Sequence, residues 1–180
     1  KRKPWDDVRV RQAVNMAINR PELVDKALLG YGAPALGLYT PAVTWAYNPK
    51  TQAPAFDAAG AEKLLDQAGR KRGADGIRLK LSLVTANVSP FKEIAQVVQE
   101  QLRSVGLETT LALLTGADYT KRVSEERAFD LALTNGSWGP DPDNLNVRFG
   151  SKGANQFMAY ASAEFDAAIA EGGRLTKLDE

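Results

Sequence analysis

Two carboxylates and an indole lie close together in the last third of the chain. Asp141 and Asp143 are one residue apart, and Trp138 precedes them. Carboxylates at this spacing can share a hard cation such as magnesium or manganese. An indole beside a few polar groups can instead give apolar contact area to a small solute. The segment is therefore a candidate site for either cation binding or solute binding.

A predicted strand leads directly into this segment. Residues 129–134 contain the short apolar run Leu131–Leu133, which is typical of a buried strand. The pairs Asn135-Gly136 and Gly139-Pro140 then interrupt regular structure on both sides of the tryptophan. The indole is thus expected at the carboxyl edge of a sheet, where open α/β sheets bind ligands. The predicted ligand contacts are Asn135, Gly136, Ser137, Trp138, Gly139 and Asp141. Asn135 and Ser137 would offer hydrogen bonds beside the indole.

Two other interpretations of the same residues are open. In the structural one, Trp138 fills the core, and Asp141 and Asp143 only cap a helix. In the enzymatic one, Asp141 and Asp143 hold a metal in a glycosyltransferase. Against the enzymatic interpretation, Pro142 between the carboxylates is typical of a helix start, and no glycine-rich phosphate-binding loop precedes a helix.

The composition removes several classes of function. The 180 residues include no cysteine and no histidine, so the usual side-chain ligands of zinc, copper and haem are missing. A Ser–His–Asp or Cys–His nucleophile is missing for the same reason. The formal net charge of +1 argues against a nucleic-acid partner. With solute binding as the leading hypothesis, we expect a protein that is not an enzyme and that has no catalytic residue, metal or cofactor.

Strands and helices alternate from residue 77 onward. The clearest strand is 77–84, where apolar and polar residues alternate almost throughout. Such an order predicts parallel strands with right-handed crossovers. The expected fold is α/β, a three-layer sandwich with a mostly parallel central sheet and helices on both faces. The predicted strands are 77–84, 107–114 and 129–134, and the helices between them are 89–106 and 117–127.

Further helices are predicted in the amino-terminal and carboxyl-terminal parts of the chain. The amino-terminal helices are expected at 6–19, 21–30 and 57–69, and the carboxyl-terminal ones before Phe149 and after Ser162. Residues 31–56 show neither helical nor strand period and contain four prolines and five aromatic residues. We expect this stretch to lie packed across the domain. No apolar run reaches the length of a membrane span, so direct membrane insertion is not expected.

Five segments, in a fixed order, carry recognisable sequence patterns: 4–20, 56–69, 98–107, 138–144 and 155–160. The first contains D-x-R-V-R-x-A followed by A-I-N-R, and the fourth places a tryptophan before Asp-Pro-Asp-Asn. In these patterns the chain resembles the extracellular solute-binding proteins of ABC importers, in the peptide- and nickel-binding branch known as family 5. The resemblance covers nearly all 180 residues.

The resemblance implies one lobe of a type II periplasmic-binding-protein fold. Residues 1–180 would form the second, carboxyl-terminal lobe, and the first lobe would lie outside this sequence. The implied function is capture of a peptide, oligosaccharide or related small solute between two lobes by hinge closure. The implied partner is the ABC importer permease, and the implied location is periplasmic or extracellular, membrane-associated through the importer. A ligand-sensing domain of a regulator is an alternative, because such domains share the fold.

Overall fold

The computed structural model divides the chain into two compact units. The first unit is Lys1–Pro34 with Pro54–Thr134, and the second unit is Ala35–Ala53 with Asn135–Glu180. The residues that the structure describes are 2–35, 37–51, 53–135, 139, 141, 143–153 and 157–174. Within these ranges no helix is both long enough and apolar enough to cross a bilayer.

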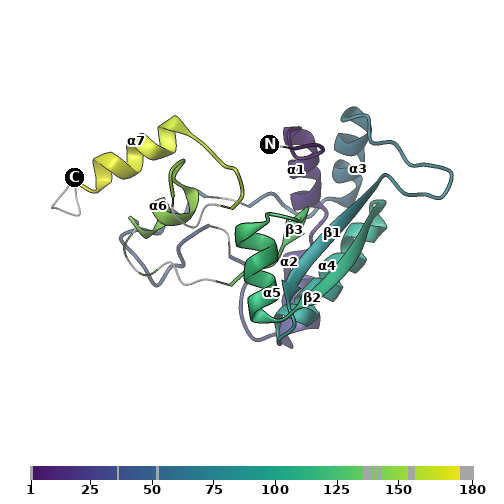
Figure 1. The fold of residues 1–180 in the computed structure, drawn as a ribbon, viewed down its shortest axis with the longest axis horizontal. Coiled ribbons are helices and arrows are strands. Elements are labelled where there is room, and N and C mark those ends of the chain that lie inside the picture. The colour runs from purple at the N-terminus through teal and green to yellow at the C-terminus, as the bar shows by residue number, and fades with distance from the viewer. Residues whose placement is uncertain are drawn as a thin grey trace. The chain divides into compact units, whose positions relative to one another are not determined.

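A parallel sheet forms the centre of the first unit (Figure 1). Among the described residues it has three strands in the order β2-β1-β3: β1 (Leu79–Ala86), β2 (Leu107–Leu114) and β3 (Leu131–Ala132). The predicted parallel sheet is confirmed, and β2 has its predicted bounds. β1 begins two residues late because the Ile77 amide and carbonyl form a turn with Asp75 and Gly73.

Alternation along β1 decides which face builds the core. Leu81 and Leu83 point to one face and are buried there against α4 (Phe91–Ser104), which contributes Ala95 and Leu102. The other face carries Val84, which is also fully buried. Since successive strand residues point to opposite faces, both sides of β1 must be covered.

The second cover comes from the segment between β2 and β3. α5 (Gly116–Thr120) packs against β1 and β2, and Figure 1 shows it on the side of the sheet opposite α4. It continues into the π-helical turn η1 (Lys121–Glu125), whose Val123 is fully buried. The helices on both faces are therefore as predicted. The single α-helix predicted over 117–127 is wrong, because the wide turn places the Glu126 amide on the Lys121 carbonyl.

Three capped helices complete the first unit: α1 (Val8–Met16), α2 (Arg20–Leu28) and α3 (Ala58–Gln67). The carboxylates of Asp7 and Asp57 and the amide oxygen of Asn19 each accept a backbone N–H at the helix start. Such caps satisfy donors that have no partner inside the helix. α1 packs against α3, and α2 packs against α4.

Gln101 of α4 is a buried polar residue that holds the start of α2. Its side-chain oxygen accepts the Asn19 amide at 3.1 Å, and its nitrogen donates to the Asn19 carbonyl and the Glu22 carboxylate, both at 3.2 Å. The contact therefore satisfies both backbone polar groups of the residue that caps α2. Contacts of this kind matter most when one partner is removed, because the other is then left buried without a hydrogen bond.

We expect Gln101→Leu to lower the free energy of unfolding by about 1–3 kcal/mol, because the volume is kept while the Asn19 groups lose their partner. Urea denaturation of the wild type and the variant measures the difference. Gln96→Leu, at an exposed position of the same helix, is the matched control and should change stability by less than about 0.5 kcal/mol. Equal effects of the two substitutions would contradict the role given to Gln101.

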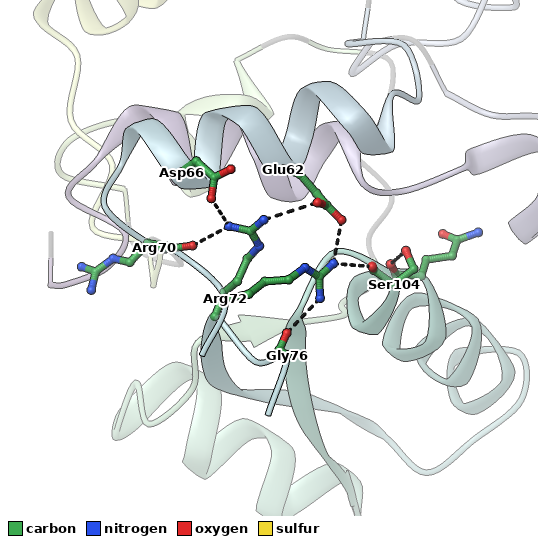
Figure 2. Close-up of polar contacts among 8 residues, drawn as sticks. Glu62, Asp66, Arg70, Arg72, Gly76 and Ser104 are labelled. Atoms are coloured by element: carbon green, nitrogen blue, oxygen red, sulfur yellow. Dashed lines mark hydrogen bonds and ion pairs between the residues drawn. The ribbon is translucent and has the colours of Figure 1, made fainter. Parts of the chain in front are cut away.

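An arginine network closes the amino-terminal edge of the same sheet (Figure 2). Arg78, next to the start of β1, pairs with Asp66 and Glu62 of α3 and also donates to the Arg70 carbonyl. Arg72 pairs with Glu62 at 2.6 Å and donates to two backbone carbonyls. The network therefore joins α3, the following loop and β1.

The second unit contains α6 (Asn144–Phe149) and α7 (Ala163–Gly172). As predicted, Ser162 caps α7, its hydroxyl accepting the Phe165 amide. The Phe165 ring packs edge-on against Phe149 and Tyr160, with centroids 6.4 and 6.2 Å away. The stretch predicted to be irregular, 31–56, contains only turns and bends where the structure describes it.

Candidate functional site

Half of the predicted ligand contacts belong to the described part of the chain. Asn135, Gly139 and Asp141 are described, whereas residues 136–138, with Gly136, Ser137 and Trp138, lie outside the described residues. The chain enters the second unit at Asn135, three residues after β3 ends. The predicted order of strand, loop and helix is therefore present.

Hydrogen bonds from Tyr39 and from two residues that follow Asp141 fix the position of Asp141. The Tyr39 hydroxyl donates to the Asp141 carbonyl at 3.2 Å, although 102 residues separate the two in sequence. One carboxylate oxygen of Asp141 accepts the Asp143 amide at 3.0 Å, and the carbonyl also accepts the Asn144 amide at 3.1 Å. The Asp141 side chain is exposed, so its carboxylate can still meet a ligand.

The hydroxyl of Tyr39 stays protonated at neutral pH. Burial raises the pKa of Tyr39, and the negative charge of Asp141 raises it further. A protonated phenol can donate its hydrogen bond, which is what the contact with the Asp141 carbonyl requires. Tyr39 thus serves as a fixed neutral support for this loop.

The position of Gly139 explains the glycine between the tryptophan and the carboxylates. Its φ is +65°, a conformation that residues with a side chain rarely adopt. An added Cβ would also lie 3.0 Å from the side-chain nitrogen of Asn144. Position 139 therefore favours glycine.

The helix-capping interpretation of the two carboxylates is correct only in part. Asp143 stands at the N-cap position of α6, but its side chain makes no capping hydrogen bond. The carboxylate of Asp141 instead accepts the amide of Asp143, as in an Asx turn. Neither carboxylate therefore makes a capping hydrogen bond to α6.

A hollow of about 310 Å³ lies in the second unit beside Tyr39. Apolar and aromatic side chains form most of it, and the described lining residues are Gly37, Leu38, Tyr39, Trp45, Ala46, Asn48, Thr51 and Leu145. We call it the Trp45 pocket. No sequence pattern predicted this pocket. The aromatic residues of 31–56 were the feature that could have indicated it.

The loop after the central strand is a second feature that the sequence analysis missed. β1 is followed by exposed Asn87, Val88 and Ser89, which lead into α4 on one face. β2 is followed by Thr115, which leads into α5 on the other face. Crossovers that leave neighbouring strands on opposite faces open a crevice at the carboxyl edge, where ligands bind. The same rule that pointed to the loop after β3 also applies to Asn87–Ser89.

Asp130 fixes the point at which β3 starts. Its carboxylate accepts the Ser82 amide at 2.8 Å and the Ser82 hydroxyl at 2.9 Å, and its own amide donates to that hydroxyl. Arg2 pairs with the other carboxylate oxygen at 3.1 Å, and the Trp5 indole lies 3.5 Å from it. Asp130 thereby takes the place of a ladder bond, which explains why β3 pairs only from Leu131 onward, two residues later than predicted.

Comparison with models of known families identifies the family of this chain. The model of the bacterial extracellular solute-binding proteins, family 5, matches residues 1–157. The chain belongs to this family. The resemblance noted in the five sequence segments is therefore confirmed.

Relatives of this family 5 protein extend well beyond the matched region. Heme-binding protein A of Haemophilus influenzae is 30% identical over 185 residues, which cover 98% of the chain and 33% of the relative. Glutathione-binding protein GsiB of Escherichia coli is 36% identical over 124 residues, covering 68% of the chain and 22% of the relative. The family 5 chain thus spans a third or less of these relatives.

Solved structures show the same fold. The dipeptide binding protein of Pseudoalteromonas sp. SM9913, in complex with Met-Leu, is 27% identical with a TM-score of 0.86. That match covers 99% of the family 5 chain and 36% of the solved one. HbpA2 of Haemophilus parasuis is 25% identical with a TM-score of 0.85. The α/β architecture is therefore part of the type II periplasmic-binding-protein fold, as predicted.

The metal hypothesis gains no support from this family 5 chain. Among the described residues, no group of three or more Asp, Glu, His or Cys side chains could hold a metal ion. The family itself is one of solute-binding proteins.

Proposed function

We propose that this chain is the second, carboxyl-terminal lobe of a two-lobed binding protein that captures a solute for an ABC importer. The match of the family model to residues 1–157 carries the proposal. The lengths of the relatives support the assignment to one lobe, since the chain covers about a third of each. The importer permease as partner, and a periplasmic or extracellular location at the importer, belong to the same proposal.

The solute would bind between the lobes and be enclosed when they close about the hinge. On this lobe, the loop after β3 would contact it through Asn135, Gly136, Ser137, Trp138, Gly139 and Asp141. The indole would give apolar contact, and the amide and hydroxyl groups would give hydrogen bonds.

A short peptide is the solute that we favour. Two relatives are named for peptide ligands, glutathione for GsiB and Met-Leu for the Pseudoalteromonas protein. The exposed carboxylate of Asp141 suits the ammonium group at the start of a peptide, because opposite charges in hydrogen-bond contact attract strongly. Tyr39 and the Asp143 amide hold that carboxylate in place before the solute arrives.

We expect Asp141→Asn to weaken binding of a tripeptide such as Ala-Ala-Ala by roughly 10- to 100-fold, because the ammonium group loses a negatively charged acceptor. Isothermal titration with the full-length protein that carries this chain measures the effect. The same substitution should change the affinity for the N-acetylated tripeptide, which lacks the ammonium group, by less than about threefold.

Asp143→Asn is the matched control, since it removes an exposed carboxylate two residues away that makes no capping bond. It should leave the peptide affinity within about threefold of the wild type. If the folded wild-type protein binds no peptide from a panel of di- and tripeptides, the peptide assignment is wrong. A response to oligosaccharides in the same titration would then identify the other solute class.

A further inference from the structure

The Trp45 pocket has the size and lining of a site for one apolar group. Ligand pockets in proteins measure about 300–1,000 Å³, so a hollow of about 310 Å³ lies at the small end of that range. Such a volume suits one side chain rather than a whole peptide. Tyr39 and Trp45 supply aromatic surface, and Asn48 and Thr51 supply the few polar groups.

Large apolar side chains are left exposed at this pocket. Trp45 is 50% exposed and Leu38 is 46% exposed, although both line the hollow. Leu145, in contrast, is buried on the α6 side of it. A buried wall with two exposed aromatic and aliphatic side chains can bury more apolar surface if a matching group enters.

Tyr39 connects the pocket with the loop that we assign to the solute. Its ring lines the hollow, while its hydroxyl donates to the carbonyl of Asp141 at 3.2 Å. Both residues lie in the second unit, so this adjacency exists within one compact part of the chain. A solute whose charged group meets Asp141 therefore has an apolar hollow next to its point of attachment.

We propose that the Trp45 pocket is a specificity pocket that receives one aromatic or branched aliphatic side chain of the solute. This inference rests on the proposed function, since it assigns a role to a pocket beside the same loop. The chemistry is burial of apolar area against Trp45, Leu38 and the Tyr39 ring. The Asn48 and Thr51 side chains add polar groups to the lining.

The test uses the full-length protein and alanine tripeptides in which one position is replaced by Leu or Phe. We expect one position at which the tripeptide with Leu or Phe binds roughly 10- to 100-fold more tightly than Ala-Ala-Ala. Burial of such a side chain contributes a free energy that corresponds to about this factor in affinity. Trp45→Ala should remove this preference, so that in the variant the Leu or Phe tripeptide binds within about threefold of Ala-Ala-Ala. Val147→Ala, an exposed apolar residue of the second unit outside the pocket lining, is the control and should keep the preference.

Ala46→Leu is a second variant, which fills the hollow from its wall without removing an aromatic ring. It should also abolish the preference for the larger side chains. If the wild type binds alanine tripeptides but shows no preference, or if both variants keep it, the pocket assignment is wrong while peptide capture stands. If the wild type binds none of the peptides, the proposed function is wrong and the pocket assignment with it.

Discussion

Glu62→Gln combined with Asp66→Asn is expected to lower the free energy of unfolding by about 3–5 kcal/mol, because a buried arginine would lose both of its carboxylates. The Arg78 side chain is only 3% exposed, and its guanidinium pairs with both of these residues. The two substitutions keep the shapes of the side chains but remove their charges. An uncompensated positive charge would then remain beside the start of β1.

Urea denaturation followed by circular dichroism measures this loss. Adding Arg78→Met to the double variant removes the buried charge and should restore most of the stability, since apolar replacement of a buried ion pair is often neutral. The exposed pair of Lys80 and Glu108, with side chains 74% and 49% exposed, is the comparison. Neutralising Glu108 should change stability by less than about 1 kcal/mol. A similar loss at both pairs would show that burial of Arg78 is not the cause.

The pH dependence of stability follows from the same network. The hydrogen bond from Arg72 lowers the pKa of Glu62 below its ordinary value, with the Arg72 and Arg78 charges adding to the effect and partial burial opposing it. A carboxyl group whose pKa is lower in the folded protein stabilises the fold above its unfolded pKa. This contribution is lost as the pH falls through the folded value. The double variant should therefore lose less stability on acidification than the wild type.

Local sequence patterns predicted most of the helices and strands. Strict alternation predicted β1, and the residues Asp57 and Ser162 marked helix starts that the structure confirms. These features depend on a few neighbouring residues, so they can be read without knowing the fold. The start of β3 could not be predicted in this way, because it depends on the side chain of Asp130, which reaches Ser82, 48 residues away.

The candidate site shows the same limit. The loop after β3 was predicted from breaker residues and sheet topology, both of which are local signals. The support that Tyr39 gives to Asp141 joins residues 102 positions apart, and no period or motif marks that pairing. The Trp45 pocket combines residues 37–51 with Leu145 and was hidden for the same reason. Irregular segments become interpretable only when their packing partners are known.

Asp130→Ala is expected to lower the free energy of unfolding by about 2–4 kcal/mol, because two hydrogen bonds to a charged group are lost together. The Ser82 amide would keep no partner at the edge where β1 meets β3, and the ion pair with Arg2 would also disappear. Burial raises the pKa of Asp130, but the Ser82 and Trp5 hydrogen bonds and the Arg2 charge outweigh it and lower the pKa. The ionised carboxylate is therefore the form that stabilises the fold.

The pH dependence separates this role from simple packing. Because the folded pKa of Asp130 is lowered, its stabilising effect is present above the ordinary aspartate pKa and is lost as the pH falls through the folded value. The stability difference between the wild type and Asp130→Asn should thus shrink as the pH is lowered from 7 toward about 3. Denaturation curves at several pH values measure it, with Asp75→Asn at an exposed turn as the control. A difference that stays constant across this range would mean that Asp130 acts through its shape alone, and the start of β3 would need another explanation.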